Sequence, residues 1–179
     1  MEKIKLKDKE FTLSIPEAKI QEAVKQIADN INEDLKNEKT PLFLGILNGA
    51  FMFLSDLFKE INIDCEVSFV KLASYQGTNS TGDVKQLIGL NENLSGRNVI
   101  IVEDIVDTGL TINNLVKQVK GYDPEKVRVA SLLFKPDACQ EFINLDYVGI
   151  EIPNEFIVGY GLDYDGLGRN YKDIYKAIS

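Results

Sequence analysis

The stretch VIIVEDIVDTGLT, from Val99 to Thr111, decides the fold of this chain. Its continuous apolar run leads into two adjacent acids and ends at the turn signal Asp107–Gly109. Short apolar runs bounded by turn residues are typical of strands buried on both faces. Beyond the turn we expect a helix, closed by Gly121 as a left-handed cap. The stretch therefore predicts a buried strand at 98–102 and a helix at about 110–120.

Further strands and helices alternate along the rest of the chain. A helix is expected to start at SIPE, with the Ser14 hydroxyl as its cap and Glu17 three residues later, and its apolar stripe runs from Ile20 to Leu35. Strands are predicted at 42–47, 66–72 and 126–134, with shorter β runs at 87–90, 147–150 and 156–160. The remaining helices are one with Phe51, Leu54, Leu57 and Phe58 facing inward, and a short one starting near Tyr171.

This alternation predicts an α/β fold with a mostly parallel sheet, flanked by helices and connected by right-handed crossovers. Ligands in such folds bind at the carboxyl ends of the strands. A chain of 179 residues can bury a real core, and it shows no internal repeat or linker. We therefore expect one domain over residues 1–179.

Composition excludes several classes of function. The sequence contains no histidine, which rules out histidine-based zinc sites and Ser-His-Asp triads. Its net charge of −8 argues against nucleic acid as a partner, because binding phosphates broadly needs Lys and Arg. An acidic protein that binds a phosphorylated small molecule must use local positive groups, backbone amides or a divalent cation.

The sequence also carries expectations about location. MEKIKLKDKEFTLS lacks the apolar stretch of a signal peptide, and no run approaches the length of a membrane helix. Cys65 and Cys139 have no Cys or His at metal-ligand spacing, so we interpret them as small core residues in a reducing compartment. We therefore expect a cytoplasmic protein without a membrane partner.

The turn at Asp107–Gly109 is typical of a phosphate site. The first amides of a helix lack internal partners and attract an anion, threonine hydroxyls add donors, and Gly109 permits close backbone approach. Glu103 and Asp104 would repel that phosphate unless they face hydroxyls or a metal, and a ribose diol with Mg²⁺ suits them. The alternative is that Asp107 and Thr108 merely cap a helix and the acids are solvated. The full pattern favours binding of an activated ribose phosphate.

This segment resembles the signature of the type I phosphoribosyltransferases, which bind phosphoribosyl pyrophosphate. From about Leu42 to Asn170, with several motifs in family order, the chain is similar to the hypoxanthine–guanine phosphoribosyltransferases. The resemblance implies the type I fold with a small hood built from the N- and C-terminal segments. It implies purine salvage, in which the 5-phosphoribosyl group is transferred to hypoxanthine and/or guanine to give IMP or GMP and pyrophosphate. It also implies a homodimer or homotetramer.

The resemblance assigns roles at the ribose phosphate. Glu103 and Asp104 would hold the ribose hydroxyls, directly or around Mg²⁺, and Asp107 is placed as general base near the imidazole half of the purine. The turn Leu47-Asn48-Gly49 matches the pyrophosphate loop, in which a non-proline cis peptide exposes amides, although many relatives carry lysine at Asn48. The 5′-phosphate loop would comprise Asp107, Thr108, Gly109, Leu110 and Thr111.

Two later motifs carry the purine roles that the resemblance implies. Lys135, in SLLFKP, would recognise the 6-oxo group, since an ammonium donor favours an acceptor oxygen over the amino group of adenine. In EFIVGYGLDYDGLGRN, Phe156 would stack on the purine and the Ile157 backbone would read its edge. Asp163 would line the purine site and meet a second Mg²⁺, and Arg169 would contact pyrophosphate.

ASYQGTNSTG resembles the mobile catalytic loop of the family, with Ser74 and Tyr75 as the pair that closes over the site within a loop of about 73–85. Two other classes remain open: a regulatory relative that keeps the sugar-phosphate site, and a phosphorylation-receiver domain, which also gathers acids at strand ends. The choice among hypoxanthine, guanine and xanthine depends on the purine's 2-position and stays open.

Overall fold

The computed structural model describes residues 3–73, 85–88, 92–140 and 142–178. Its centre is a six-stranded sheet in the order β5-β4-β3-β6-β7-β8. All neighbours pair in parallel except β5, which is antiparallel to β4, so the prediction of a mostly parallel sheet is confirmed. The strands are β3 (Leu42–Leu47), β4 (Glu66–Ala73), β5 (Lys85–Ile88), β6 (Asn98–Val106), β7 (Lys126–Phe134) and β8 (Tyr147–Glu151).

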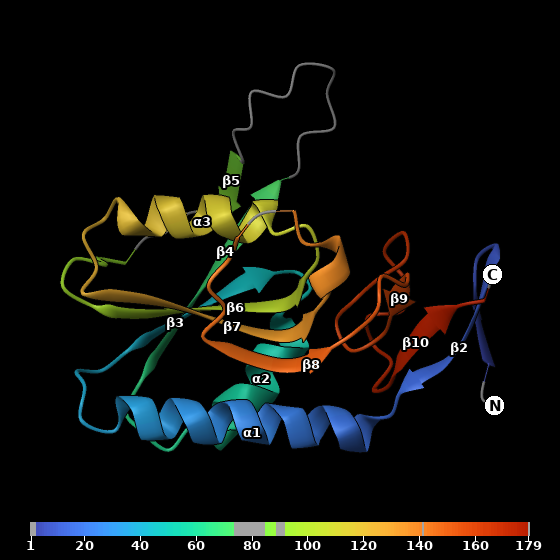
Figure 1. Ribbon diagram of the computed structural model, residues 1–179, viewed down its shortest axis with the longest axis horizontal. Helices are drawn as coiled ribbons and strands as arrows, with labels where there is room; N and C mark the ends of the chain where they lie inside the picture. Colours follow the sequence, from blue (N-terminus) through green and yellow to red (C-terminus); the bar gives the residue numbers. More distant parts are fainter. Residues whose placement is uncertain (1–2, 74–84, 89–91, 141, 179) are drawn as a thin grey trace.

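Helices cover both faces of this sheet. The helices α1 (Glu17–Leu35) and α2 (Phe51–Glu60) pack on one face, and α3 (Leu110–Lys120) packs on the other (Figure 1). Alternate residues of β6 serve the two cores: Ile100 faces α1 and α2, whereas Ile101 faces α3. This two-sided burial explains why the strand has no polar alternation in sequence.

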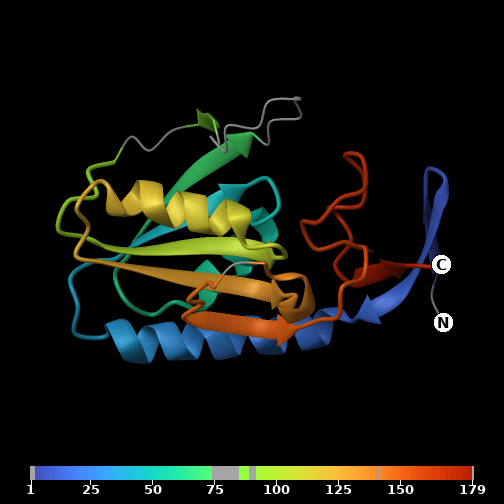
Figure 2. The same ribbon diagram turned by 45° about the horizontal axis from the view of Figure 1, so that its top comes forward.

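A second, antiparallel sheet in the order β1-β2-β10-β9 joins the two ends of the chain. Figure 2 shows that the C-terminal ends of β6, β7 and β8 point toward it. Its own small core contains Leu6, Phe11, Val158 and Tyr175. The division of the chain into domains stays a prediction. The strands are β1 (Lys3–Leu6), β2 (Lys9–Ile15), β9 (Ile157–Val158) and β10 (Ile174–Ala177).

Several local expectations were wrong. The helix expected near Tyr171 is replaced by β10, because β2 supplies a strand partner from the other end of the chain. Gly121 closes α3 with a φ of −66°, not in the left-handed region, and Phe51 is 42% exposed whereas Phe53 is buried. The two cysteines expected in the core are half-buried, although Cys65 does pack against the main core.

The N-terminus of α1 is tied to the far end of the chain. Ser14 lies within β2, and the helix begins after Pro16 without a cap from its own sequence. Instead, the backbone N–H of Glu17 donates to Oδ1 of Asp173 at 2.7 Å. An N-terminal helix amide has no partner inside the helix, so this carboxylate stabilises the helix as a cap does. In the described part of the chain, no helix has the length and apolar character needed to cross a membrane.

We expect Asp173→Ala to lower the free energy of unfolding by about 1 kcal/mol, the usual loss for a missing helix cap. Urea unfolding of the purified protein measures this change. Asp29→Ala, at an exposed position of the same helix, is the control and should not destabilise, because alanine is the better helix former. Equal stability of the two variants would contradict the capping role.

Candidate functional site

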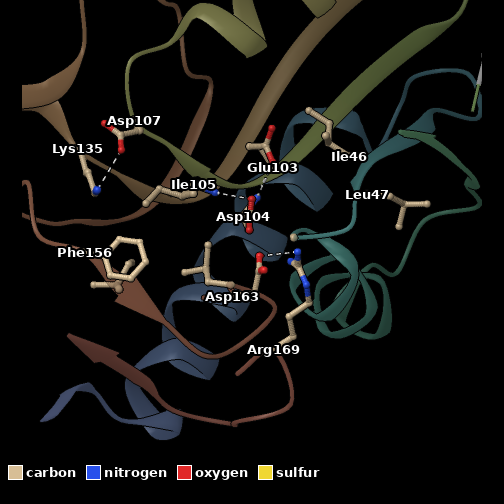
Figure 3. Close-up of a pocket in the computed structure, with 13 residues that line it drawn as sticks. Ile46, Leu47, Glu103, Asp104, Ile105, Asp107, Lys135, Phe156, Asp163 and Arg169 are labelled. Atoms are coloured by element: carbon tan, nitrogen blue, oxygen red, sulfur yellow. Dashed lines mark hydrogen bonds and ion pairs between the residues drawn. The ribbon is translucent and has the colours of Figure 1, made fainter. Parts of the chain in front are cut away.

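A cavity of about 300 Å³ lies where the C-terminal edge of the large sheet meets the segment from Phe156 to Arg169 (Figure 3). That volume is at the lower end of the range for small-molecule sites. The lining also includes Leu47, from the predicted pyrophosphate loop, and Ile46, Ile105 and Leu162, which were not predicted as site residues. The predicted site residues that line it are Gly49, Glu103, Asp104, Asp107, Lys135, Phe156, Ile157, Asp163 and Arg169.

A smaller cavity of about 140 Å³ adjoins the first and shares Glu103, Ile105 and Asp107 with it. Its other walls come from the turn between β6 and α3, including Thr108, Gly109 and Thr111. The turn therefore brings the N-terminus of α3 to the edge of the larger cavity. The free amides and positive dipole end of a helix N-terminus attract an anion. Leu110, also predicted for this loop, has an exposed side chain and can contribute only its backbone.

The conformation and packing of the turn require a glycine at position 109. Its φ is +86°, and a Cβ there would lie 2.2 Å from Cδ1 of Ile143. A side chain at this position would therefore strain the backbone and collide with the segment packed over the turn. The backbone N–H of Gln140 donates to the Thr108 carbonyl at 3.1 Å and fixes the same segment.

Glu103 and Asp104 are nearly buried, at 8% and 6% exposed. The strand β6 continues through both acids to Val106, further than the predicted 98–102, and carries them into the cavity. Burial raises the pKa of Glu103 well above its usual value, and the charge of Asp104 adds to the effect. Burial also raises the pKa of Asp104, although hydrogen bonds and the charge of Arg169 oppose it. The site therefore concentrates negative charge that hydroxyls or a cation would relieve.

The loop after β3 lies directly against Asp104. The peptide bond between Leu47 and Asn48 is cis, as the family resemblance implies. A Cβ on Gly49 would lie 1.9 Å from Oδ2 of Asp104, so only glycine lets the two segments approach this closely. The side chain of Asn48 is exposed, and the loop reaches the cavity through Leu47 and Gly49.

Lys135 and Asp107 form an ion pair, with 3.0 Å between Nζ and Oδ2. Lys135 follows the last residue of β7 and is 6% exposed, whereas the Asp107 side chain is 46% exposed. The buried ammonium therefore points into the cavity beside a carboxylate that solvent can reach (Figure 3). This pairing gives the site a donor and a potential proton acceptor in contact.

The segment after β9 supplies a second ion pair, between Asp163 and Arg169 (Figure 3). Asp163 also accepts a hydrogen bond from the backbone N–H of Gly166 at 2.7 Å, and a guanidinium N–H of Arg169 donates to the Gly161 carbonyl. The two side chains are equally exposed, at 28%. This segment thus forms a small turn that places one positively charged and one negatively charged side chain at the edge of the cavity.

Phe156 presents a ring that is 46% exposed. Tyr164 packs edge-on to it with 5.7 Å between ring centroids, Phe11 lies at 6.1 Å, and the ammonium of Lys9 lies 5.2 Å from the ring centre. These supporting residues were missed, because Lys9 and Phe11 belong to a hairpin that has no clear pattern in sequence. Ile157 is buried in β9.

The remaining predicted residues do not add to the cavity. Ser74 and Tyr75 lie outside the described residues, and of the loop expected at about 73–85 only the ends are described, as the last residue of β4 and the first of β5. Within the described ranges, no three carboxylates or thiols gather closely enough to hold a metal by themselves. Magnesium does not need such a cage, because it is usually held by one or two carboxylates, water and substrate phosphates. Glu103, Asp104 and Asp163 fit that pattern.

Comparisons with known proteins agree with this geometry. Residues 16–165 match the family described as phosphoribosyl transferase domain. The hypoxanthine phosphoribosyltransferase of Buchnera aphidicola subsp. Schizaphis graminum is 40% identical over 166 residues, covering 92% of this chain and 94% of that protein. The hypoxanthine phosphoribosyltransferase of Escherichia coli K12 is 37% identical, with coverages of 92% and 93%.

Solved structures give the same result. A crystal structure of a hypoxanthine-guanine phosphoribosyltransferase from Bacillus anthracis, with a HEPES molecule in its active site, aligns with a TM-score of 0.88 at 36% identity. The alignment covers 93% of this chain and 98% of that one. Similarity of this extent removes the alternative of a phosphorylation-receiver domain.

The buried acids predict how stability depends on pH. Since the folded-state pKa values lie above the unfolded values of about 4.5 and 3.8, the folded chain binds more protons, and stability falls as pH rises from about 4 through the folded-state values. Glu103→Gln removes one of the two charges. We expect this variant to be more stable than the wild type at pH 7, by an amount that shrinks on acidification at up to about 1.4 kcal/mol per pH unit.

Urea unfolding of both proteins between pH 4 and pH 8 tests this expectation. Glu125→Gln, at an exposed position, is the control and should leave the pH dependence unchanged. If the free energies of unfolding of E103Q and the wild type differed by the same amount at every pH, the raised pKa of Glu103 would be refuted.

Proposed function

The chain belongs to the phosphoribosyltransferase family, and we propose from this membership that the cavity binds phosphoribosyl pyrophosphate and a 6-oxopurine together. The protein is a purine-salvage enzyme that transfers the 5-phosphoribosyl group to hypoxanthine and/or guanine, giving IMP or GMP and pyrophosphate. The observation that carries the site assignment is the meeting, in one cavity, of residues from separate motifs: Gly49, the Glu103–Asp107 segment, Lys135 and the Phe156–Arg169 segment.

The sugar-phosphate half of the substrate would lie along the end of β6. Glu103 and Asp104 would bind the ribose hydroxyls, since carboxylates accept hydrogen bonds and the negative charge of this buried pair is only partly offset by Arg169. The turn formed by residues 107–111 would bind the 5′-phosphate through its amides and the hydroxyls of Thr108 and Thr111. The amides near Leu47–Gly49 and the guanidinium of Arg169 would hold the pyrophosphate, since a guanidinium can donate two parallel hydrogen bonds to phosphate oxygens.

The purine would lie between Lys135 and Phe156. The Lys135 ammonium would donate to the 6-oxo oxygen, and the exposed ring of Phe156 would stack on the base. The backbone at Ile157 and the carboxylate of Asp163 would meet the opposite edge of the purine. The near-burial of Lys135 supports this role, because a buried ammonium needs an acceptor and the ion pair with Asp107 leaves donors unused.

Catalysis would then consist mainly of positioning and charge stabilisation. A ring nitrogen of the purine forms a bond to the anomeric carbon as the bond to pyrophosphate breaks, and positive charge develops on the sugar. Glu103 and Asp104, which line the cavity, would stabilise that charge. Asp107 would accept the proton that the purine nitrogen loses.

Magnesium is the proposed cofactor. Glu103 and Asp104 would hold one ion and Asp163 a second, each together with substrate oxygens, and the buried carboxylate pair supports the fit. When bound, the ion supplies positive charge that offsets the negative charge of phosphoribosyl pyrophosphate. The carboxylates themselves orient the ribose.

Two further proposals concern the cell and the assembly. A cytoplasmic location is supported by Cys65, which is a half-buried thiol in a chain with only two cysteines. A homodimer or homotetramer is supported by the large apolar side chains of Val67 and Phe69, which are 42% and 38% exposed on β4. Light scattering coupled to size-exclusion chromatography measures the assembly.

Nucleotide formation with each component omitted in turn tests the activity and the cofactor. We expect IMP or GMP only when phosphoribosyl pyrophosphate, a 6-oxopurine and Mg²⁺ are all present. A panel of hypoxanthine, guanine, xanthine and adenine at fixed phosphoribosyl pyrophosphate ranks the bases. No turnover with any 6-oxopurine would contradict the function, and full turnover in the presence of a chelator would contradict the role of Mg²⁺.

Lys135→Met tests recognition of the purine. Loss of a hydrogen bond from a charged donor should lower kcat/KM for hypoxanthine and guanine by about 10- to 100-fold and leave kcat/KM for adenine nearly unchanged. Lys126→Met, at the exposed opposite end of β7, is the matched control and should behave like the wild type. An equal loss for every purine would show that Lys135 does not read the 6-position.

A further inference from the structure

Tyr160 is a buried tyrosine whose hydroxyl reaches a carboxylate in another element. Its side chain is part of the core beneath α1 and α2, and the residue is only 2% exposed. The hydroxyl donates to Oδ2 of Asp56, in α2, at 2.6 Å. Asp56 also accepts from Nε2 of Gln21, in α1, at 2.8 Å and forms an ion pair with Lys59. Tyr160 does not line the substrate cavity, so its contact with Asp56 does something other than bind substrate.

The backbone around Tyr160 contacts both parts of the proposed pyrophosphate site. Gly161, the next residue, accepts a hydrogen bond from the Arg169 guanidinium, and its N–H donates to the Arg169 carbonyl at 3.0 Å. Its φ is +95°, and a Cβ there would lie 2.2 Å from the carbonyl oxygen of Gly49. Reciprocal hydrogen bonds between Gly159 and Leu162, at 3.1 and 3.0 Å, close the turn. The turn thus rests on the loop after β3 while it holds Arg169.

The turn needs an anchor because its backbone conformation is unfavourable. Tyr160 has a φ of +48°, in the left-handed region that residues with a Cβ seldom occupy. A hydrogen bond from a hydroxyl to a carboxylate is among the stronger ones, and it is formed here at 2.6 Å between a buried tyrosine and a partly buried aspartate. The bond to Asp56 therefore helps to keep Tyr160, and with it the Gly161 carbonyl, in one place.

We propose that Tyr160 and Asp56 are positioning residues, which fix the Gly161 carbonyl and thereby aim the Arg169 guanidinium at the pyrophosphate group. The proposal rests on the proposed function, in which Arg169 binds that group. It adds a specific link: the rigid pair α1 and α2, through Gln21 and Asp56, sets the geometry of a residue on the C-terminal segment. Neither Tyr160 nor Asp56 touches the reacting atoms.

The chain contains a matched control for this contact. Tyr147, in β8, is also buried, at 4% exposed, and its hydroxyl donates to Oδ2 of Asp34, in α1, at 2.9 Å. The two tyrosine–aspartate pairs are similar in chemistry and burial. Tyr147, however, lies at the first position of its parallel strand, opposite to the edge that carries the cavity. If the Tyr160 contact only stabilised the fold, removing it should therefore have the same effect as removing the Tyr147 contact.

The experiment compares Tyr160→Phe with Tyr147→Phe by steady-state kinetics in both directions. We expect Y160F to raise KM about tenfold for phosphoribosyl pyrophosphate and for pyrophosphate. A tenfold change corresponds to about 1.4 kcal/mol, which is the order of the free energy that a hydrogen bond to a charged group contributes. KM for hypoxanthine and guanine should stay within about twofold. Y147F should leave all these constants within about twofold while lowering the melting temperature to a similar extent. If Y160F and Y147F changed only the melting temperature, the proposal would be overturned.

A double-mutant cycle tests the route through Arg169. In the R169K background, where the planar fork is absent, Y160F should raise KM for phosphoribosyl pyrophosphate by less than about twofold. A full tenfold effect in that background would show that Tyr160 does not act through Arg169. Asp56→Asn, which keeps an acceptor oxygen but loses the charge, provides a second variant and should give a smaller rise in the same two constants. An unchanged D56N beside an impaired Y160F would remove Asp56 from the proposal.

The outcomes separate this inference from the proposed function. Absence of turnover in the wild type would contradict the function itself. An active wild type in which R169K leaves KM for phosphoribosyl pyrophosphate unchanged would contradict the role of Arg169. A raised KM in R169K together with a normal KM in Y160F would contradict only the positioning role.

Discussion

The site depends on the close packing of three backbone segments around Gly49. The carboxylate of Asp104 occupies the space where a Cβ of residue 49 would be, and Gly161 approaches the carbonyl of Gly49 so closely that it too can carry no side chain. The end of β6, the loop after β3 and the turn after β9 therefore meet at a single point. Because a packed interior tolerates little change in volume, each segment limits the position of the other two. The cavity lies among these segments, and its shape follows from their contact.

The same packing buries negative charge that the fold does not neutralise. Glu103 and Asp104 lie side by side at the end of a strand, and the nearest compensation comes from hydrogen bonds and the charge of Arg169. Carboxylates whose pKa values are raised by burial lower the stability of the ligand-free protein near neutral pH. In the proposed function, the ribose hydroxyls and Mg²⁺ would relieve that electrostatic penalty. Part of the binding free energy of phosphoribosyl pyrophosphate would then come from charge that is already in place before the substrate arrives.

The large sheet was predictable from sequence because its strands are continuous apolar runs, as in LFLGIL at 42–47 and NVIIV at 98–102, and such runs are typical of strands buried on both faces. The start of α3 was predictable because Asp107, Thr108 and Gly109 interrupt the apolar run. The second sheet was not: β2 pairs with β10, and nothing local in either short segment indicates a partner more than a hundred residues away. The acids and the phosphate turn at the end of β6 were predicted from the residue pattern itself, whereas the roles of Lys135 and Phe156 came from family resemblance. Lys9 and Phe11, which support Phe156, belong to the hairpin that was missed.

The contacts that sequence could not predict are the ones that join the two ends of the chain to its middle. Asp173 caps α1 across 156 positions, and Tyr160 reaches Asp56 across 104. The Tyr160 contact connects α2 with the segment that carries the proposed purine- and pyrophosphate-binding residues, and the Asp173 contact connects α1 with the chain just after that segment. A local pattern records only which face of an element is apolar, and it contains no information about which distant carboxylate accepts a hydrogen bond. The strands bring the acids to one edge of the sheet, and these long-range polar contacts then set where the opposite wall of the cavity stands.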